Sequence, residues 1–262
     1  MKYGCCVNMF GEEADPVGIK YITYLAECGY DYVELPLAQV MELSSREFGI
    51  LKTTLKNNGI GCECCNNFFP ASIRLTGENT SPAVIEEYIQ KACTRAAELD
   101  AKVIVFGSSG AKNVPEGYPM EEAFHQIAEV LKIADKYAFP KEIQIAIEPL
   151  NHKESNIIIN LSDSKKLMKA ADASSIRLLV DYYHFMVEKE SIEAIKENGA
   201  DIIHVHFAEQ DGRSFPKNPS EDYRLFFDTL RKTGYDSRIS IEAYSSQIKD
   251  DMVNALRIMK NL

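Results

Sequence analysis

The sequence lacks several features that would indicate a membrane or nucleic-acid protein. It has no tryptophan, only five histidines and no excess of positive charge, since the formal net charge is −10. No apolar run is long enough to cross a bilayer. Nucleic-acid binders need basic patches that neutralise phosphates, and none stands out. No secretory leader precedes the folded-looking start, so we expect a cytoplasmic protein without membrane or nucleic-acid partners.

Disulfides are also not expected. The seven cysteines are an odd number in a chain too long to need cross-links, which suggests free thiols in a reducing compartment. The segment Cys62-Glu63-Cys64 lacks the two-residue gap of common zinc knuckles. We expect Cys62 and Cys64 to share one face of a strand and to pack there as small hydrophobic side chains.

Short β-rich runs alternate with helical patterns along the whole chain. Several runs are almost entirely apolar, such as Val103–Phe106, as expected for strands buried on both faces of a parallel sheet. At 262 residues, the chain has the length of one α/β barrel, and we expect a single domain over residues 1–262. The eight predicted strands are Lys2–Asn8, Tyr30–Leu35, Gly61–Asn66, Lys102–Gly107, Ile143–Glu148, Ile176–Asp181, Ile202–Phe207 and Ile239–Ala243.

Helix signals lie between these strands. Asp15-Pro16 and Ser81-Pro82 each offer an N-cap followed by proline at the first helical position. Gly29 follows the first of these helices as a stop. Further helices are predicted from Ser162 to Ala171 and from Gln247 to Lys260, and Gly199 and Gly234 follow two more. Eight strands, each followed by a helix, predict an α/β protein with a (β/α)8 barrel. An open doubly wound sheet is the alternative, but no glycine-rich phosphate motif follows the first strand.

Four strands in the second half of the chain end in acidic or imidazole side chains. In a barrel, functional groups lie at the C-terminal ends of the strands and in the loops that follow them. Any one of these side chains alone would suit a capping or surface role. Together they form one set: Glu148, Asp181, the pair His204 and His206, and Glu242.

This set predicts a divalent metal site. Each carboxylate follows an apolar run, where an unpaired buried charge would cost several kcal/mol. Converging carboxylates would also repel one another without a cation. Three carboxylates and one imidazole suit manganese, magnesium or cobalt better than a thiolate-type zinc site. His204, two residues before His206 on the same strand face, is expected to support the site from one layer deeper.

The motifs at these strand ends resemble those of the xylose-isomerase-like TIM barrel superfamily of sugar phosphate isomerases and epimerases. Within it, the chain is most similar to the ketose 3-epimerase and hydroxypyruvate isomerase branch. The resemblance covers essentially the whole chain. It is carried by Glu148-Pro149-Leu150-Asn151, Asp181 with His184, His204-Val205-His206 and Ile241-Glu242.

The resemblance implies roles for these residues. Glu148, Asp181, His206 and Glu242 would bind one divalent ion, with manganese expected and magnesium, cobalt or zinc as alternatives. Glu154, His184 and Arg213 would contact the substrate. A simpler interpretation exists for each of these three: a surface acid, a core histidine and a solvated arginine. The resemblance also implies a homo-oligomer, either a dimer or a tetramer.

The sequence departs from the characterised ketose 3-epimerases in three places. It has no tryptophan for the aromatic wall of their sugar site, and it carries Cys5-Cys6-Val7-Asn8 where they present aromatic residues. The segment between His206 and Arg213 is one residue longer than expected. These differences affect the substrate assignment and leave the metal site intact.

We therefore predict a divalent-metal-dependent isomerase or epimerase of a small sugar or keto-sugar. Glu148 and Glu242 would act as acid and base on a metal-stabilised cis-enediolate. The alternative is a metal-dependent lyase or dehydratase that uses the same enolisation on an oxidised sugar, glycoside or inosose.

Three other functions fit the sequence less well. An apurinic-site endonuclease would need more histidines and a basic face. A phosphosugar isomerase would need a phosphate clamp, for which Gly107-Ser108-Ser109-Gly110 is a weak candidate that loop flexibility explains equally well. A non-catalytic sugar-binding protein has little use for two carboxylates flanking a metal. His125 and His152 are expected at the surface.

Overall fold

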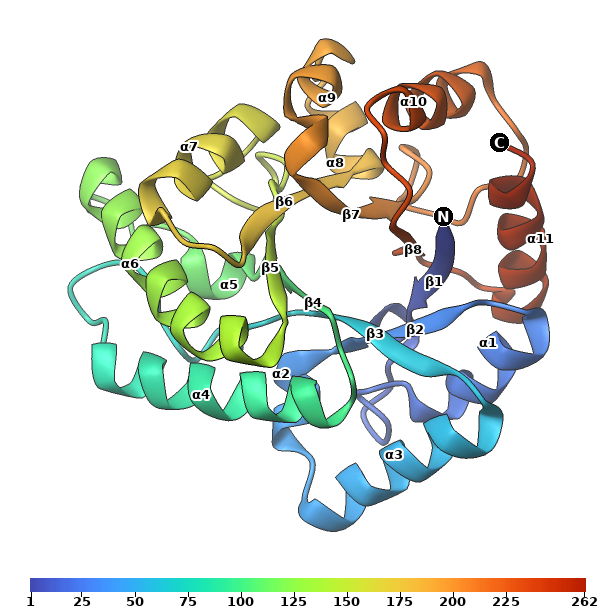
Figure 1. Cartoon of the computed structure of the whole chain (residues 1–262), viewed down its shortest axis with the longest axis horizontal. Coiled ribbons are helices and arrows are strands. Elements are labelled where there is room, and N and C mark those ends of the chain that lie inside the picture. Colours follow the sequence, from blue (N-terminus) through green and yellow to red (C-terminus); the bar gives the residue numbers. More distant parts are fainter.

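The computed structural model describes all 262 residues and closes the eight strands into one parallel barrel (Figure 1). The strands pair in chain order, and β1 pairs with β8 to complete the ring. The predicted barrel is therefore confirmed and an open sheet is excluded. The strands are β1 Lys2–Cys6, β2 Tyr32–Pro36, β3 Gly61–Asn66, β4 Val103–Phe106, β5 Gln144–Ile147, β6 Ile176–Asp181, β7 Ile202–Phe207 and β8 Arg238–Ile241.

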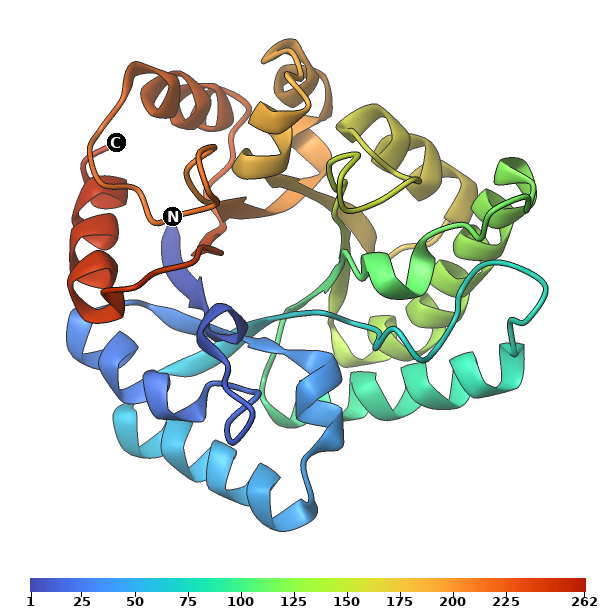
Figure 2. The same cartoon turned by 180° about the vertical axis from the view of Figure 1, so that it is seen from behind.

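Helices form an outer ring around the strands, as the two opposite views show (Figures 1 and 2). No helix combines the length and the apolar character needed to span a membrane. The α-helices are α1 Ile22–Cys28, α2 Leu37–Glu42, α3 Ser45–Asn58, α4 Pro82–Glu98, α5 Ser109–Lys112, α6 Met120–Ala138, α7 Leu161–Ala171, α8 Tyr182–Val187, α9 Glu193–Asn198, α10 Glu221–Lys232 and α11 Ile248–Lys260. Four 3-10 turns accompany them: η1 Val7–Phe10, η2 Ile19–Tyr21, η3 Phe139–Lys141 and η4 Gly199–Asp201.

Strand ends differ from the prediction by one to two residues where they matter for function. The first strand was expected to reach Asn8, but it ends at Cys6 because the chain turns into η1. Glu148 and Glu242 each lie one residue beyond their strands. Their backbone N–H groups still donate to the preceding strands, to Phe106 and Phe207 respectively, both at 3.2 Å. These two carboxylates therefore leave the barrel wall where its regular pairing stops.

Two helix starts are corrected by the structure. The first helical segment was expected to begin at Pro16, but it begins with η2 at Ile19. The Asp15 carboxylate accepts N–H bonds from Gly18, Ile19 and Lys20 at 2.9–3.0 Å at the start of this turn. The helix expected from Ser162 begins at Leu161, and the side chain of Asn160 is its cap. Pro82 is the first residue of α4 as predicted, although the side chain of Ser81 makes no capping bond.

The expectation that Cys62 and Cys64 share a strand face is wrong. The register between β2 and β3 shifts at this point, since Val33 pairs with Cys62 and the next residue, Glu34, pairs with Cys64. The extra residue in β3 rotates the chain locally. Cys62 therefore packs with Cys65 (Sγ to Sγ 3.7 Å) in the outer core, whereas Cys64 belongs to the small inner cluster.

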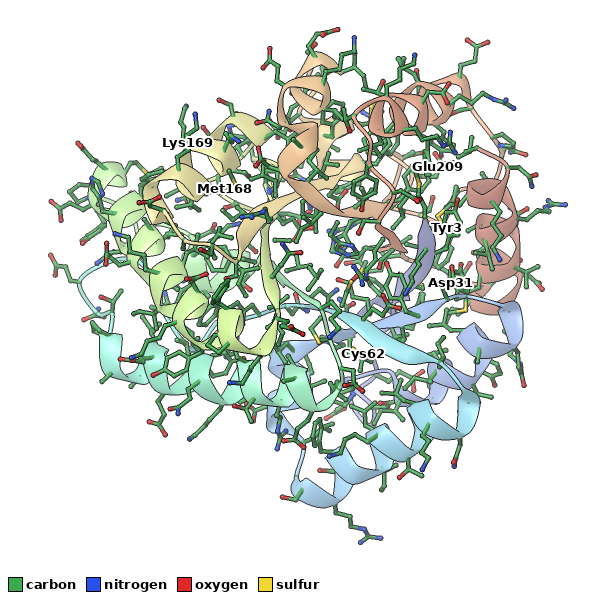
Figure 3. All side chains as sticks on the ribbon, in the orientation of Figure 1. Tyr3, Asp31, Cys62, Met168, Lys169 and Glu209 are labelled. Atoms are coloured by element: carbon green, nitrogen blue, oxygen red, sulfur yellow. The ribbon has the colours of Figure 1, made fainter.

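Side chains fill the centre of the barrel (Figure 3). A large core lies between strands and helices, and a separate inner cluster comprises Tyr32, Cys64, Val103, Val105, Ala146 and Leu179. Tyr32 is the largest member of this inner cluster. Its ring occupies space left by Gly4, where an added Cβ would lie 2.3 Å from the ring. The Tyr32 hydroxyl lies 2.8 Å from Ser240 Oγ, which connects this packing to the polar groups above it.

Replacing Gly4 by alanine tests this packing. The new methyl group would force Tyr32 off its position, so we expect Gly4→Ala to lower the free energy of unfolding by about 1–3 kcal/mol. Urea denaturation followed by circular dichroism measures the change. Gly61→Ala is the matched control, because a Cβ at Gly61 on β3 would meet nothing within 4 Å. Equal urea midpoints for the two variants would contradict the described packing.

Candidate active site

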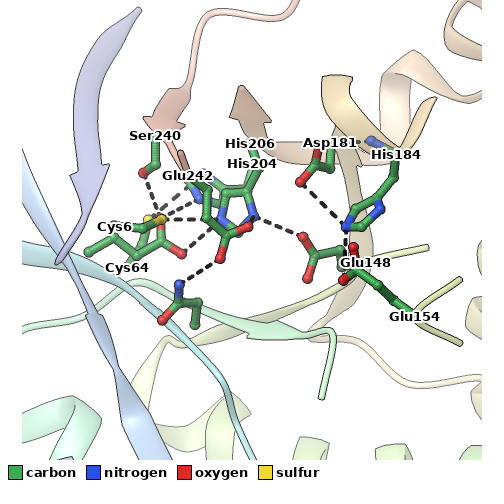
Figure 4. A network of polar contacts seen from close by, with 12 residues as sticks. Cys6, Cys64, Glu148, Glu154, Asp181, His184, His204, His206, Ser240 and Glu242 are labelled. Atoms are coloured by element: carbon green, nitrogen blue, oxygen red, sulfur yellow. Dashed lines mark hydrogen bonds and ion pairs between the residues drawn. The ribbon is translucent and has the colours of Figure 1, made fainter. Parts of the chain in front are cut away.

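The four predicted metal ligands converge at the C-terminal mouth of the barrel, from β5 to β8 (Figure 4). Their side chains are all buried, and one ligand atom from each lies within 4.8 Å of every other. Asp181 is the last residue of β6, and His206 lies near the end of β7. Parallel strands of a barrel end at the same rim, which brings residues up to 94 positions apart in the sequence into one cluster.

His206 is the centre of this cluster. Its Nδ1 lies 2.9 Å from Glu148 Oε1 and 3.1 Å from Glu242 Oε2, and Figure 4 shows these carboxylates on either side of the ring. Burial opposes charging of the ring, but Glu242 and then Glu34 raise the pKa of His206 well above its ordinary value. A nitrogen that faces two carboxylates needs either a proton or a cation between them. The donor set therefore fits a divalent cation with oxygen-rich ligands.

Arg213 is the cationic side chain within this acidic cluster. Its Nη2 lies 2.5 Å from Glu242 Oε2 and 3.5 Å from Asp181 Oδ2, and its Nη1 lies 3.4 Å from Glu154 Oε2. Burial lowers the pKa of Arg213, but Glu242 and Asp181 more than reverse this effect. The guanidinium also stacks over the ring of Tyr183 at 5.1 Å. With a side chain only 14 % exposed, Arg213 is not a solvated surface residue.

His184 faces the same cluster as a neutral side chain. Its Nδ1 accepts the backbone N–H of Asn151 at 3.1 Å, which leaves the proton on Nε2. Nε2 is buried without a hydrogen-bond partner, 3.8 Å from Asp181 Oδ2 and 4.0 Å from Glu154 Oε2. Burial lowers the pKa of His184 to about 4. One nitrogen is thus satisfied by the backbone, and the other is an N–H donor available to a ligand.

A cavity of about 450 Å³ opens over these groups. Glu148, Glu154, Arg213 and Glu242 line one side of it, and all are predicted site residues. The loops after β1 to β4 line the other side with neutral residues, among them Asn8, Gln39, Asn67, Phe69, Ser108 and Ser109. A second cavity, of about 590 Å³, lies among Lys2, Lys102 and Arg238 and contains none of the predicted site residues.

Three buried residues near the cluster escaped the sequence analysis. Asn66 donates its side-chain N–H to Glu242 Oε1 at 3.0 Å. Lys112 donates from Nζ to the backbone oxygen of Glu148 at 3.2 Å. Glu34 lies below the cluster, with its carboxylate 2.9 Å from His206 Nε2. The sequence does hold a signal for Glu34, because an acidic residue inside an apolar strand needs a buried partner. His125 and His152 are exposed, as expected.

Gly107 provides the space that Glu148 occupies. A Cβ at position 107 would lie 2.1 Å from Glu148 Oε2. We expect Gly107→Ala to turn the Glu148 carboxylate away from His206 and to weaken manganese binding about tenfold or more. Isothermal titration calorimetry of chelator-treated protein measures the affinity. Gly49→Ala on α3, where a Cβ meets nothing within 4 Å, is the control. Unchanged affinity in Gly107→Ala would show that Glu148 does not need this space.

Lys112 should make stability depend on alkaline pH. Burial lowers the pKa of this fully buried amine from 10.5 to about 8. Between about pH 8 and pH 10.5 the unfolded chain binds more protons than the folded one. The free energy of unfolding therefore rises with pH across this window, and the gain is lost again as the pH falls to about 8. Relative to Lys112→Met, the metal-free wild-type protein should gain up to about 3 kcal/mol between pH 7 and pH 10.5. Urea denaturation across this range measures the difference. Lys132→Met on α6 is the control, and its free energy of unfolding should depend on pH as that of the wild type does. If Lys112→Met showed this same pH dependence, the lowered pKa of Lys112 would be refuted.

Comparisons with known proteins identify the family to which the barrel belongs. The family model for the xylose isomerase-like TIM barrel matches residues 22–262. A ketose 3-epimerase of Arthrobacter globiformis is 26 % identical, over 100 % of this chain and 90 % of that protein. An L-ribulose 3-epimerase of Methylomonas sp. (strain DH-1) is 24 % identical, over 93 % of this chain and 84 % of the relative.

Solved structures show the same fold at lower identity. The structure of D-psicose 3-epimerase in the presence of D-fructose has a TM-score of 0.89 at 18 % identity, covering 100 % of this chain and 99 % of that one. The apo structure of 3-keto-D-glucoside 4-epimerase from E. coli has a TM-score of 0.84 at 18 % identity and covers 100 % of both chains. Since the family model matches almost the whole chain, the protein belongs to the xylose isomerase-like TIM barrel family.

Proposed function

We propose that this enzyme is a divalent-metal-dependent sugar epimerase that inverts a carbon beside the carbonyl group of a ketose or keto-sugar. The observation that carries the proposal is the pair Glu148 and Glu242, which approach the same nitrogen of His206 from β5 and β8. The names of the relatives support it, because they include ketose 3-epimerase, L-ribulose 3-epimerase and D-psicose 3-epimerase.

Two carboxylates placed in this way suit inversion. A divalent cation held by Glu148, Asp181, His206 and Glu242 would supply Lewis acidity that stabilises negative charge on the carbonyl oxygen. One of Glu148 and Glu242 removes the proton beside the carbonyl, and the other returns a proton to the opposite face of that carbon. The two residues exchange roles when the reaction runs backwards.

Three further side chains offer hydrogen bonds of the kinds that hydroxyl groups need. His184 Nε2 and Arg213 Nε are buried donors without partners in the protein. Glu154, whose side chain is 35 % exposed, provides carboxylate oxygens as acceptors at the same side of the cavity. We assign these three to holding substrate oxygens, because a hydroxyl can both accept and donate.

The charges around the cavity favour an unphosphorylated substrate. Arg213 is the one cationic residue among the lining residues, and it already contacts three carboxylates. Apart from the proposed metal ion, a phosphate group would face Glu148, Glu154 and Glu242 without a free basic side chain to bind it. The neutral lining after β1 to β4 instead suits hydroxyl groups.

Deuterium exchange tests the reaction. The protein is stripped with chelator, supplied separately with manganese, cobalt, magnesium or zinc, and incubated with a panel of ketoses in deuterated water. We expect metal-dependent deuterium at the carbon beside the carbonyl, together with the epimer, detected by NMR and mass spectrometry. Deuterium with loss of water would indicate the alternative lyase or dehydratase, and an aldose product would indicate isomerisation. Failure to bind any of the four metals would refute the proposal.

Single substitutions distinguish the roles of the two carboxylates. Glu148→Gln and Glu242→Gln should each lower epimerisation by about 10²–10⁴-fold, because one face loses its acid–base group. Each variant should still exchange deuterium into the epimer whose proton faces the remaining carboxylate. Glu129→Gln, at an exposed position on α6, is the control and should retain full activity. Substantial epimerisation by both active-site variants would overturn the assignment.

A further inference from the structure

A buried carboxylate lies directly beneath the metal-ligand cluster. Glu34, on β2, has no exposed surface, and each of its oxygens faces a histidine of β7. Oε1 lies 2.9 Å from His206 Nε2, and Oε2 lies 2.8 Å from His204 Nε2. Ser240 on β8 donates its hydroxyl to Oε2 at 2.5 Å, and the Tyr32 hydroxyl is 2.8 Å from Ser240 Oγ. Figure 4 shows Ser240, His204 and His206 gathered on one side of the cluster.

The chemistry of a carboxylate fixes the protons of both imidazole rings. An ionised carboxylate can only accept hydrogen bonds, so a histidine nitrogen at 2.8–2.9 Å from it must carry a hydrogen. In a neutral imidazole with its hydrogen on Nε2, the lone pair lies on Nδ1. When a cation takes the place of the proton on Nδ1, the lone pair of His206 would point between Glu148 and Glu242, where the cation is expected. The opposite tautomer would direct N–H at the cation and prevent ligation.

His204 completes the arrangement from below. Its Nε2–H donates to Glu34, and its Nδ1 lies 3.9 Å from the thiol of Cys64, within reach of a weak S–H bond. His204 is fully buried and touches none of the four predicted ligands through a hydrogen bond. Its hydrogen bond reaches the metal cluster through Glu34, and its ring also packs edge-on against that of His206, with centroids 5.0 Å apart. This refines the expectation drawn from its place on the strand.

We propose that Glu34 is a positioning residue for the metal centre, holding His206 in the tautomer that presents Nδ1 to the cation. The inference rests on the proposed function, since it assumes that His206 binds a metal. Glu34 itself does not line the substrate cavity. Its action passes through His206, as expected for a carboxylate that orients a metal-binding histidine.

The variant Glu34→Gln tests this role with little change in side-chain size. Glutamine offers one acceptor oxygen and one N–H₂ donor, so it cannot accept from both histidines with separate oxygens. One ring must adopt the other tautomer or lose its partner. We expect the affinity for manganese, measured by calorimetry on chelator-treated protein, to fall about 10–100-fold. The circular dichroism spectrum should stay that of the wild type.

Ser240→Ala is the matched control. It removes one donor to Glu34 from the same buried layer but leaves both histidine contacts in place. Its manganese affinity should stay within about threefold of the wild type, because the tautomer of His206 is unchanged. Equal losses of affinity in Glu34→Gln and Ser240→Ala, in parallel with their losses of stability, would indicate a merely structural network and would overturn the proposal.

A measurement on the wild-type protein does not depend on how the variant folds. Long-range ¹H–¹⁵N spectra of the magnesium-loaded protein should show His206 with its hydrogen on Nε2, and a hydrogen on Nδ1 would overturn the proposal. Unchanged affinity in Glu34→Gln, with the wild type binding metal, would refute this inference alone. A wild-type protein that binds no metal would refute both this inference and the proposed function.

Discussion

The mutual repulsion of three buried carboxylates is the constraint on which the site depends. Glu148, Asp181 and Glu242 are brought within 4.8 Å of one another and of His206 because the strands that carry them end at one rim. Arg213 offsets part of this charge, but it is shared among Glu154, Asp181 and Glu242. Such a cluster is costly without a cation between its carboxylates, which is the physical reason for the proposed metal site.

The two halves of the barrel contribute different kinds of side chain to the site. Strands β5 to β8 carry the charged groups, whereas the loops after β1 to β4 line the cavity with neutral residues such as Gln39 and Asn67. Exceptions to this division come from below and beside the cluster. Glu34 on β2 reaches across the barrel to His206, and Gly107 after β4 leaves room for Glu148. The candidate metal cluster therefore depends on β2 and on the segment after β4, as well as on β5 to β8.

The cavity of this chain has few aromatic residues in its lining. It has no tryptophan, and Phe69 and Tyr244 are the aromatic residues that line the cavity. Amide and hydroxyl side chains stand beside them. The relatives share only 18–26 % of their residues with this chain in the comparisons described above, although the backbone is closely similar.

The sequence by itself determined the barrel and the residues that gather at its mouth, because apolar strand patterns and the acidic residues that follow them are local signals. Glu148, Asp181 and Glu242 could be named for this reason, whereas the choice of His206 over His204 came from the family resemblance. The tertiary structure alone decided the partners of Glu34 and Lys112, and the opposite orientations of Cys62 and Cys64. Glu34 meets His206 only across the closed barrel, 172 residues away. One shift of register between β2 and β3 places the side chains of Cys62 and Cys64 on opposite faces of the strand. Such contacts depend on register and closure, which alternation along a single strand does not encode.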